Sequence, residues 1–402
     1  MNKLKEEFRK ELLDNILPFW MKIMPDPDGG FFGRMTGEGE LCPDAEKGAI
    51  LNARILWTFS ASARVLADKN CLEWARYAFD YLREHFIDRQ YGGVFWSLNA
   101  DGTPRDTKKQ FYAIAFTVYA LAEYYRATEE IRALDEAIEL FRCIEEHSLD
   151  KVDTGYLEAC TRNWGTIDDM RLSDKDMNAA KTMNTHLHIL EAYTGLYRVW
   201  KDAGLATALK RTIRLFLDRI VCSNGHLGLF FDNQWRLCST AFSYGHDIET
   251  SWLLCEAADV LAAGNPGGAC ETAFQDEVRR VSAALAGASM EGFTPEGGMQ
   301  YEFDPATGHR NPSRDWWVQA ETVVGCVNRF QLTSNPEWMR RAIDQWEFIK
   351  KHIICPNGEW YWAALPDGSG GFSPDTVGDR AGFWKCPYHN GRMCLEIIER
   401  NF

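Results

Sequence analysis

The chain has 402 residues, of which 46% are hydrophobic, and its formal net charge is −14. An acidic surface repels phosphate backbones and anionic lipid, so the charge argues against binding to nucleic acid or to membranes. The longest apolar runs are also too short to span a bilayer.

A short turn that combines glycine with aromatic residues recurs six times along the chain. Neighbouring turns are about 60 to 75 residues apart, and a repeat of this length indicates one supersecondary unit stacked several times. No such unit buries its apolar face without its neighbours, so we expect a single domain over residues 1–402. The turns are Asp28–Phe32, Tyr91–Trp96, Thr154–Leu157, Asn224–Phe230, Glu296–Tyr301 and Asn357–Trp362.

Apolar spacing at i, i+3, i+4 and i+7 predicts two helices for each turn. In chain order these helices cover about Leu4–Lys22, Gly48–Ala67, Leu72–Ile87, Lys109–Ala127, Glu130–His147, Lys181–Trp200, Ala206–Ile220, Gly245–Ala262, Thr272–Ala286, Trp316–Phe330, Glu337–Ile353 and Tyr388–Arg400. Six helical hairpins can close into a ring. The sequence therefore predicts an all-α fold, an (α/α)6 barrel with short β-hairpin-like loops at the mouth of a central pocket.

One helix of each predicted pair is unusually apolar and carries polar or aromatic residues near its start. If the repeats are equivalent, these residues converge on one mouth of the barrel. In chain order they are Arg54, Tyr112, Asn184 with His188, His246 with Glu249, Trp317 with Glu321, and Trp384 with His389.

Each of these residues also has a structural interpretation. Charged groups are seldom fully buried unless they are paired, so Arg54 either faces a cavity or pairs with a core carboxylate such as Glu321. A solitary helix histidine such as His188 is as often structural as catalytic. His246 is a better candidate, because Glu249 one turn later can orient and tune its imidazole.

Two imidazoles facing one cavity indicate proton transfer, because an unperturbed histidine titrates near pH ~6.5. General acid–base catalysis of this kind contributes about 10²–10⁴-fold in rate. An arginine beside the imidazoles can hold a developing enolate oxygen, so the set fits proton abstraction next to a carbonyl. The sequence has no phosphate-binding loop, dinucleotide-binding motif or GxSxG elbow, and this reaction needs no cofactor.

The twelve cysteines form no CxxC pair and no Cys/His cluster with zinc spacing. We therefore expect no metal site and a reduced, cytoplasmic compartment. We expect the only partner to be a small sugar, and the protein to be a monomer or a weak homodimer.

The chain resembles the N-acylglucosamine 2-epimerase superfamily, and it is most similar to the cellobiose 2-epimerase branch of that superfamily. The likeness extends over nearly the whole chain and rests on five motifs in the same order. They are Arg54–Trp57, Lys181–His188, Ser243–Glu249, Trp316–Glu321 and Trp384–Arg392.

The resemblance implies an (α/α)6 barrel that epimerises the reducing-end sugar of a β-1,4-linked disaccharide at C2, through a cis-enediolate. It implies that His246 and His389 exchange the C2 proton and that His188 assists ring opening. It further implies that Arg54 holds O1 and O2 and that Glu249 supports His246. Residues implied to contact the substrate are Tyr112, Asn184, Asp176, Trp252, Trp317, Glu321 and Trp384.

Other functions stay open. An N-acylglucosamine 2-epimerase or an aldose–ketose isomerase would act on a monosaccharide with the same barrel and a similar enediol step. A glycoside hydrolase would use Glu249 and Glu321 as its two carboxylates, and a sugar-binding module would use the mouth without chemistry. The identity of the second sugar depends on the loops 163–178 and 364–383.

Overall fold

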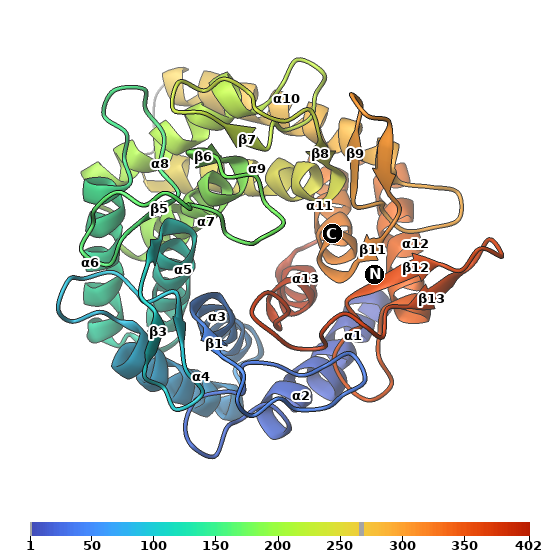
Figure 1. The fold of residues 1–402 in the computed structure, drawn as a ribbon. Coiled ribbons are helices and arrows are strands. Elements are labelled where there is room, and N and C mark those ends of the chain that lie inside the picture. The colour runs from blue at the N-terminus through green and yellow to red at the C-terminus, as the bar shows by residue number, and fades with distance from the viewer. Residues whose placement is uncertain (1, 265–268) are drawn as a thin grey trace.

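The computed structural model describes residues 2–264 and 269–402. Within them, six inner helices surround a central axis, and each packs against the next (Figure 1). The last packs against the first, which closes the ring and confirms the predicted (α/α)6 barrel. The inner helices are α3 (Ala49–Leu66), α5 (Phe111–Thr128), α7 (Met183–Val199), α9 (Tyr244–Gly264), α11 (Trp316–Thr333) and α13 (Tyr388–Glu399).

An outer ring of helices covers the inner one (Figure 1). The outer helices are the continuous run α1 (Asn2–Lys10), η1 (Glu11–Ile16) and α2 (Leu17–Lys22), then α4 (Lys69–Tyr81) with η2 (Leu82–Phe86), α6 (Ile131–His147), α8 (Ala203–Leu215) with η3 (Phe216–Ile220), α10 (Ala269–Ser289) with η4 (Met290–Gly292), and α12 (Pro336–His352). Five hairpins join an inner helix to the outer helix that follows it. The sixth pairs α13 with α1, so the two ends of the chain complete the ring together.

The two rings differ in their apolar pattern because they are buried differently. The outer helix α6 buries one stripe at helical spacing, which includes Ala133, Ala137, Leu140 and Ile144. The inner helix α3 buries every residue of 49–63, since it faces the outer ring on one side and the barrel axis on the other. A helix that is apolar all round needs such a position.

The six glycine–aromatic turns are structurally equivalent. Each is closed by an isolated antiparallel bridge, and these are Pro25–Phe31, Ile87–Val94, Leu149–Tyr156, Val221–Leu227, Phe293–Met299 and Ile354–Trp360. Gly30 shows why glycine is needed there. Its φ of 68° lies in the left-handed region, and a Cβ at this position would come within 2.6 Å of the Tyr81 ring.

Five small antiparallel sheets line the mouth end of the barrel. In each, the strand just before an inner helix pairs with a strand that follows the next turn along the chain, which ties neighbouring repeats together. The sheets are β1 (Lys47–Gly48), β2 (Ser97–Leu98) and β3 (Pro104–Asp106); β4 (Lys109–Gln110) and β5 (Ala159–Cys160); β6 (Lys181–Thr182) and β7 (Phe230–Phe231); β8 (Phe242–Ser243), β9 (Glu302–Asp304) and β10 (His309–Asn311); and β11 (Arg314–Asp315), β12 (Ala363–Pro366) and β13 (Phe372–Pro374).

Buried lysines anchor the start of four inner helices. In the first three repeats the lysine two residues before the helix bonds an aspartate of the turn before it, and in the last repeat Lys385 bonds Glu359 at 2.7 Å. We call these four pairs the anchor pairs. The other three are Lys47–Asp26 at 2.6 Å, Lys109–Asp88 at 2.9 Å and Lys181–Asp150 at 2.7 Å.

None of the helices in the described part of the chain combines the length and the apolar character needed to cross a membrane.

Candidate active site

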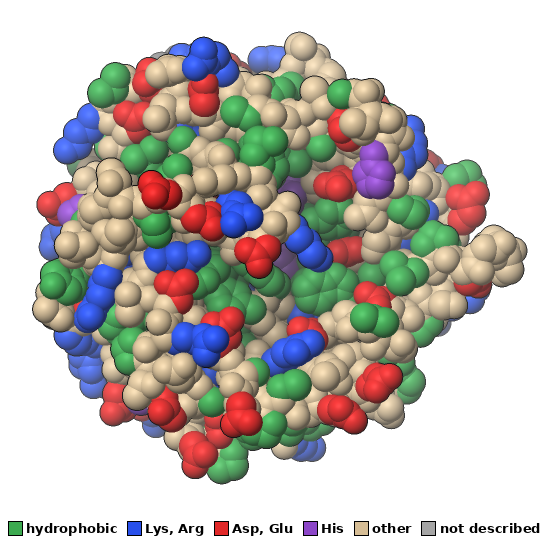
Figure 2. Space-filling view, viewed as in Figure 1, with side chains coloured by type: hydrophobic (Ala, Val, Ile, Leu, Met, Phe, Trp, Pro, Cys, Tyr) green, Lys and Arg blue, Asp and Glu red, His purple; other side chains and the backbone are tan. Residues whose placement is uncertain are grey.

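The first turns of the inner helices meet at one end of the barrel, which we call the mouth. Viewed from this end, the centre of the ring is hollowed, and histidine side chains are visible at the bottom of the hollow (Figure 2). The predicted residues lie on the first two turns of these helices, except Trp384, which lies four residues before α13. The equivalence of the repeats is therefore what brings them together.

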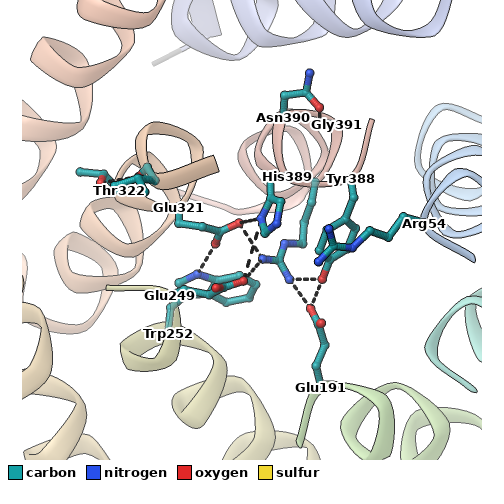
Figure 3. Close-up of polar contacts among 12 residues, drawn as sticks. Arg54, Glu191, Glu249, Trp252, Glu321, Thr322, Tyr388, His389, Asn390 and Gly391 are labelled. Carbon is teal, nitrogen blue, oxygen red and sulfur yellow. Dashed lines mark hydrogen bonds and ion pairs between the residues drawn. The ribbon is translucent and has the colours of Figure 1, made fainter. Parts of the chain in front are cut away.

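His389 enters the mouth from the start of α13 and is held from behind by a carboxylate. Its Nδ1 lies 2.8 Å from Glu321 Oε1, which leaves Nε2 as the nitrogen that can reach a substrate (Figure 3). Glu321 also accepts hydrogen bonds from Trp252 Nε1 at 3.0 Å and from Arg392 Nη2 at 2.6 Å. Three donors on Glu321 fix the orientation of His389.

Arg392 joins three buried carboxylates, Glu191, Glu249 and Glu321, which are labelled in Figure 3. Its Nη2 donates to Glu249 Oε1 at 2.7 Å as well as to Glu321, and its Nη1 donates to Glu191. Arg392, Glu191 and Glu249 are each at most 2% exposed, and Glu321 is fully buried. Buried ions of this kind are tolerated only when they are closely paired.

His188 is linked to the same network. Its Nδ1 lies 3.0 Å from Glu191 Oε2, and its ring packs against Tyr112 and Phe116 with centroid distances of 4.8 and 4.5 Å. Burial lowers the pKa of His188 to about 4, although Glu191 opposes the shift. The imidazole is therefore neutral at physiological pH.

No carboxylate among the described residues bonds to His246. Its Nδ1 is buried without a hydrogen-bond partner among the described residues, and its ring centroid lies 4.6 Å from that of Trp317. The same Trp317 ring lies 5.7 Å from His389. Burial lowers the pKa of both His246 and His389 to about 3, and only at His389 does a hydrogen-bonded carboxylate, Glu321, oppose it.

Arg54 is a buried cation without a carboxylate among the described residues. It is 3% exposed, its Nη2 donates to the Tyr112 hydroxyl at 3.0 Å, and its guanidinium lies 4.1 Å from the Phe116 ring centre. Its Nε has no partner among the described residues. The alternative that Arg54 pairs with Glu321 is wrong, since Arg392 occupies that carboxylate. An uncompensated cation of this kind is suited to a developing oxyanion.

The remaining predicted substrate residues lie higher in the mouth. Asn184 Oδ1 is buried without a partner among the described residues, so it is free to accept a hydrogen bond from a ligand. The Trp384 ring lies 5.9 Å from Tyr112 and 6.1 Å from Trp96. Asp176 accepts hydrogen bonds from both the backbone N–H and the hydroxyl of Ser173, in the loop before α7.

Comparison with known proteins identifies the family of the chain. The profile of the N-acylglucosamine 2-epimerase (GlcNAc 2-epimerase) family matches residues 30–377. The chain belongs to this family. It is 53% identical to the cellobiose 2-epimerase of Bacteroides fragilis and 39% identical to that of Ruminococcus albus, with 98% of each chain covered in both cases. Its fold matches the solved cellobiose 2-epimerase of Bacillus thermoamylovorans with a TM-score of 0.92 at 38% identity, over 100% of both chains. The protein is a carbohydrate epimerase and thus an isomerase.

Three expected roles differ from the geometry of this epimerase. Glu249 was expected to support His246, but it bonds Arg392 and lies 4.0 Å from His389 Nδ1. Trp252 and Glu321 were expected to contact the substrate, but they are 1% and 0% exposed and lie behind His389. Their side chains lie between the inner helices, where Trp252 bonds Glu321 and Glu321 holds the imidazole of His389.

Glu191 and Arg392 were given no role from the sequence, although both belong to the hydrogen-bond network of the site. The signal was present, because each is a charged residue three positions after a candidate histidine in an apolar helix. Whether such a charged residue forms an ion pair or faces solvent depends on the neighbouring helices, which the sequence alone does not place. Tyr388, whose hydroxyl donates to Glu191, was also given no role.

Glu249, Glu321 and His389 offer ligand atoms that lie within 4.8 Å of one another, a spacing that suits a metal ion. Arg392 Nη2 already donates to both carboxylates. The guanidinium therefore supplies the positive charge that a metal ion would otherwise bring.

A second cavity, of about 210 Å³, lies at the opposite end of the inner helices. Its walls include Trp57, Tyr119 and the ion-paired arginines Arg64, Arg126 and Arg198. Glu191, the partner of His188, forms part of its wall on the side of the mouth. The barrel axis thus has a polar space at each end, with the Arg392 network between them.

Proposed function

We propose that this epimerase inverts C2 of the reducing-end sugar of a β-1,4-linked disaccharide by deprotonation and reprotonation. The observation that carries the proposal is the pair of buried imidazoles, His246 and His389, whose ring centroids lie 4.6 and 5.7 Å from that of Trp317. Two bases that share one aromatic wall are suited to the two faces of a single carbon atom.

The reaction begins with opening of the sugar ring, in which His188 exchanges protons with the ring oxygen and O1. Its neutral imidazole, held by Glu191 at 3.0 Å, can accept a proton and return it. The open-chain aldehyde then presents an acidic C2 proton.

One imidazole removes the C2 proton and gives a cis-enediolate. Arg54 holds the negative O1 and O2, a role favoured by its burial and by the absence of a carboxylate partner among the described residues. After rotation about C2–C3 the other imidazole, in its protonated form, returns a proton to the opposite face. Glu321 stabilises the imidazolium form of His389.

Two observations favour a disaccharide over a monosaccharide. The Trp384 ring lies next to those of Trp96 and Tyr112, with centroid distances of 6.1 and 5.9 Å, and an aromatic group of this kind suits the flat face of a second pyranose. The 53% identical relative is named a cellobiose 2-epimerase. Cellobiose, lactose and β-1,4-mannobiose are therefore the substrates to test.

The test is proton NMR of the enzyme with cellobiose, with β-1,4-mannobiose and with mannose, each in deuterated water. A 2-epimer that carries deuterium at C2 of the reducing-end sugar is the expected product. Turnover of mannose alone would replace the proposal with a monosaccharide epimerase or isomerase, and release of free glucose from cellobiose would replace it with a hydrolase. The His246→Gln variant is the matched control, since it lacks one of the two proposed bases and should form no 2-epimer from any of the substrates.

A further inference from the structure

Three buried carboxyl groups converge on one guanidinium at the bottom of the mouth. Arg392 Nη2 donates to Glu249 Oε1 at 2.7 Å and to Glu321 Oε1 at 2.6 Å, while Nη1 donates to Glu191. One positive charge therefore faces three groups that would each be negative in water. A cluster with this composition needs additional protons to be stable at low exposure.

The hydrogen bonds differ between the two carboxyl groups that share Nη2. Glu321 accepts from three donors, namely Arg392, His389 and Trp252, all of which favour its ionised form. Glu249 accepts from Arg392 alone among the described residues. When two carboxylates share one site, the one with fewer donors retains the proton.

The surroundings of Glu249 support the same assignment. Burial and the neighbouring Glu321 raise the pKa of Glu249 to about 8, although Arg392 opposes the shift. The opposite holds for Glu321, whose pKa is lowered to about 2, because Arg392 and His389 outweigh the effect of burial.

The titratable and charged groups around Glu249 come from four inner helices. They are Tyr112 on α5, Glu191 on α7, Glu321 on α11, and Tyr388, His389 and Arg392 on α13. The outer helices α8 and α10 also pack against α9, and their described residues contribute no hydrogen bond to Glu249.

We propose that Glu249 is a protonated, neutral carboxylic acid in the working enzyme, and that this neutrality leaves His389 free to change between imidazole and imidazolium. The second part rests on the proposed epimerase reaction, in which His389 must both give and take a proton. Glu249 Oε1 lies 4.0 Å from His389 Nδ1. An ionised Glu249 would add a second negative charge beside His389 and hold it as the imidazolium, which cannot act as a base. Glu249 is thus a positioning residue that sets the charge around the imidazole.

The first experiment requires no activity. Infrared difference spectroscopy of wild type against Glu249→Gln at neutral pH should show the carbonyl stretch of a protonated carboxylic acid in wild type only. Glu123→Gln is the matched control, because Glu123 is buried between Arg64 and Arg126 and should lose only carboxylate bands. A difference spectrum for Glu249→Gln with carboxylate bands alone would overturn the proposal, whatever reaction the enzyme catalyses.

The second experiment measures the pH profile of kcat/KM for the disaccharide. Wild-type kcat/KM should fall as the pH rises through the pKa of Glu249, which is about 8. This decrease at alkaline pH should be absent in Glu249→Gln. At neutral pH we expect Glu249→Gln to lose less than about tenfold, the scale of one neutral hydrogen bond. Glu321→Gln should lose about 10²-fold or more, because it removes an ionised partner from a buried cluster.

An unchanged alkaline limb in Glu249→Gln, or a loss as large as that of Glu321→Gln, would overturn the role assigned to Glu249. If no sugar is turned over, the proposed reaction fails and the infrared result alone decides the protonation state. Thermal unfolding of each variant checks that the fold is retained.

Discussion

The two ends of the inner helices use arginine in different ways. At the end opposite the mouth, Arg64 bonds Glu123 and Glu399, and Arg126 bonds Glu123. At the mouth, Arg54 has no carboxylate among the described residues and rests on the Phe116 ring. The ion pairs at the far end hold neighbouring helices together, whereas a buried cation without a counter-charge is suited to bind a ligand.

Histidines show the same contrast. His186 uses both ring nitrogens, since Nε2 accepts from the Tyr156 backbone N–H at 2.9 Å and Nδ1 lies 2.7 Å from the Thr182 carbonyl. His246, on the equivalent part of α9, has a buried Nδ1 without a partner among the described residues. Burial alone does not separate a structural histidine from a functional one, but the state of its hydrogen bonds does.

The largest expected effect is on catalysis. His246→Ala and His389→Ala should each lower kcat by about 10²–10⁴-fold, because each removes one of the two proposed acid–base groups. His309→Ala is the control, since His309 is exposed on β10. Steady-state kinetics with circular dichroism of each variant measures the effect. Full activity in His246→Ala or His389→Ala would remove that residue from the mechanism.

The next effect is on stability. Arg392→Met leaves the buried carboxyl groups without their cation, and we expect the free energy of unfolding to fall by about 3–5 kcal/mol. Arg126→Met breaks a partly exposed pair at the opposite end and should cost less than about 1 kcal/mol. Urea unfolding compares the two variants. Equal losses would contradict the expectation that the fully buried Arg392 network contributes more to stability than the partly exposed Arg126–Glu123 pair.

A smaller effect follows from pH. Burial lowers the pKa of His186 and His188 to about 4 and that of His246 and His389 to about 3. The unfolded chain binds these protons near pH ~6.5, so below that pH the unfolded state holds more protons than the native state. The free energy of unfolding should therefore fall as the pH drops from about 6.5 toward 4, by about 1.4 kcal/mol per pH unit for each histidine.

Urea unfolding at a series of pH values measures this slope. His246→Asn should reduce the slope by the contribution of one proton, whereas His309→Asn should leave it unchanged because His309 is exposed. A slope in His246→Asn equal to that of wild type would show that His246 titrates normally in the native state.

The smallest effect concerns the second sugar. Trp384→Ala should raise KM for a disaccharide by roughly fivefold, the scale of about 1 kcal/mol of aromatic packing, and should affect a monosaccharide less. Trp338→Ala on the outer helix α12 serves as the control. An equal change for both classes of sugar would argue against a role of Trp384 in packing against the second ring.

The sequence predicted most of the fold because the fold is a repeat. The glycine–aromatic turns and the apolar periodicity predicted both rings of helices. The polar and aromatic residues near the starts of the inner helices predicted the position of the mouth. The pairing of α13 with α1 was not predicted, since it joins the two ends of the chain.

For the site, the sequence located candidate residues more reliably than it assigned their roles. Glu249 was placed with His246 because the two are one turn apart, yet the carboxyl group turns toward Arg392 on another helix. Such roles depend on contacts between helices, and the spacing of residues along one helix does not predict those contacts. The cytoplasmic location and the monomeric or weakly dimeric state stay predictions.

The four anchor pairs have a consequence for how this molecule can vary. Each pair, such as Lys109–Asp88 or Lys385–Glu359, ties the start of an inner helix to a turn by a short bond, and all four lysines are at most 1% exposed. The segments that leave the mouth between these fixed points can then change in length or composition without moving the helix starts. We therefore expect that exchanging the loop 163–178 between relatives changes which sugar is preferred and leaves the proposed proton transfer intact.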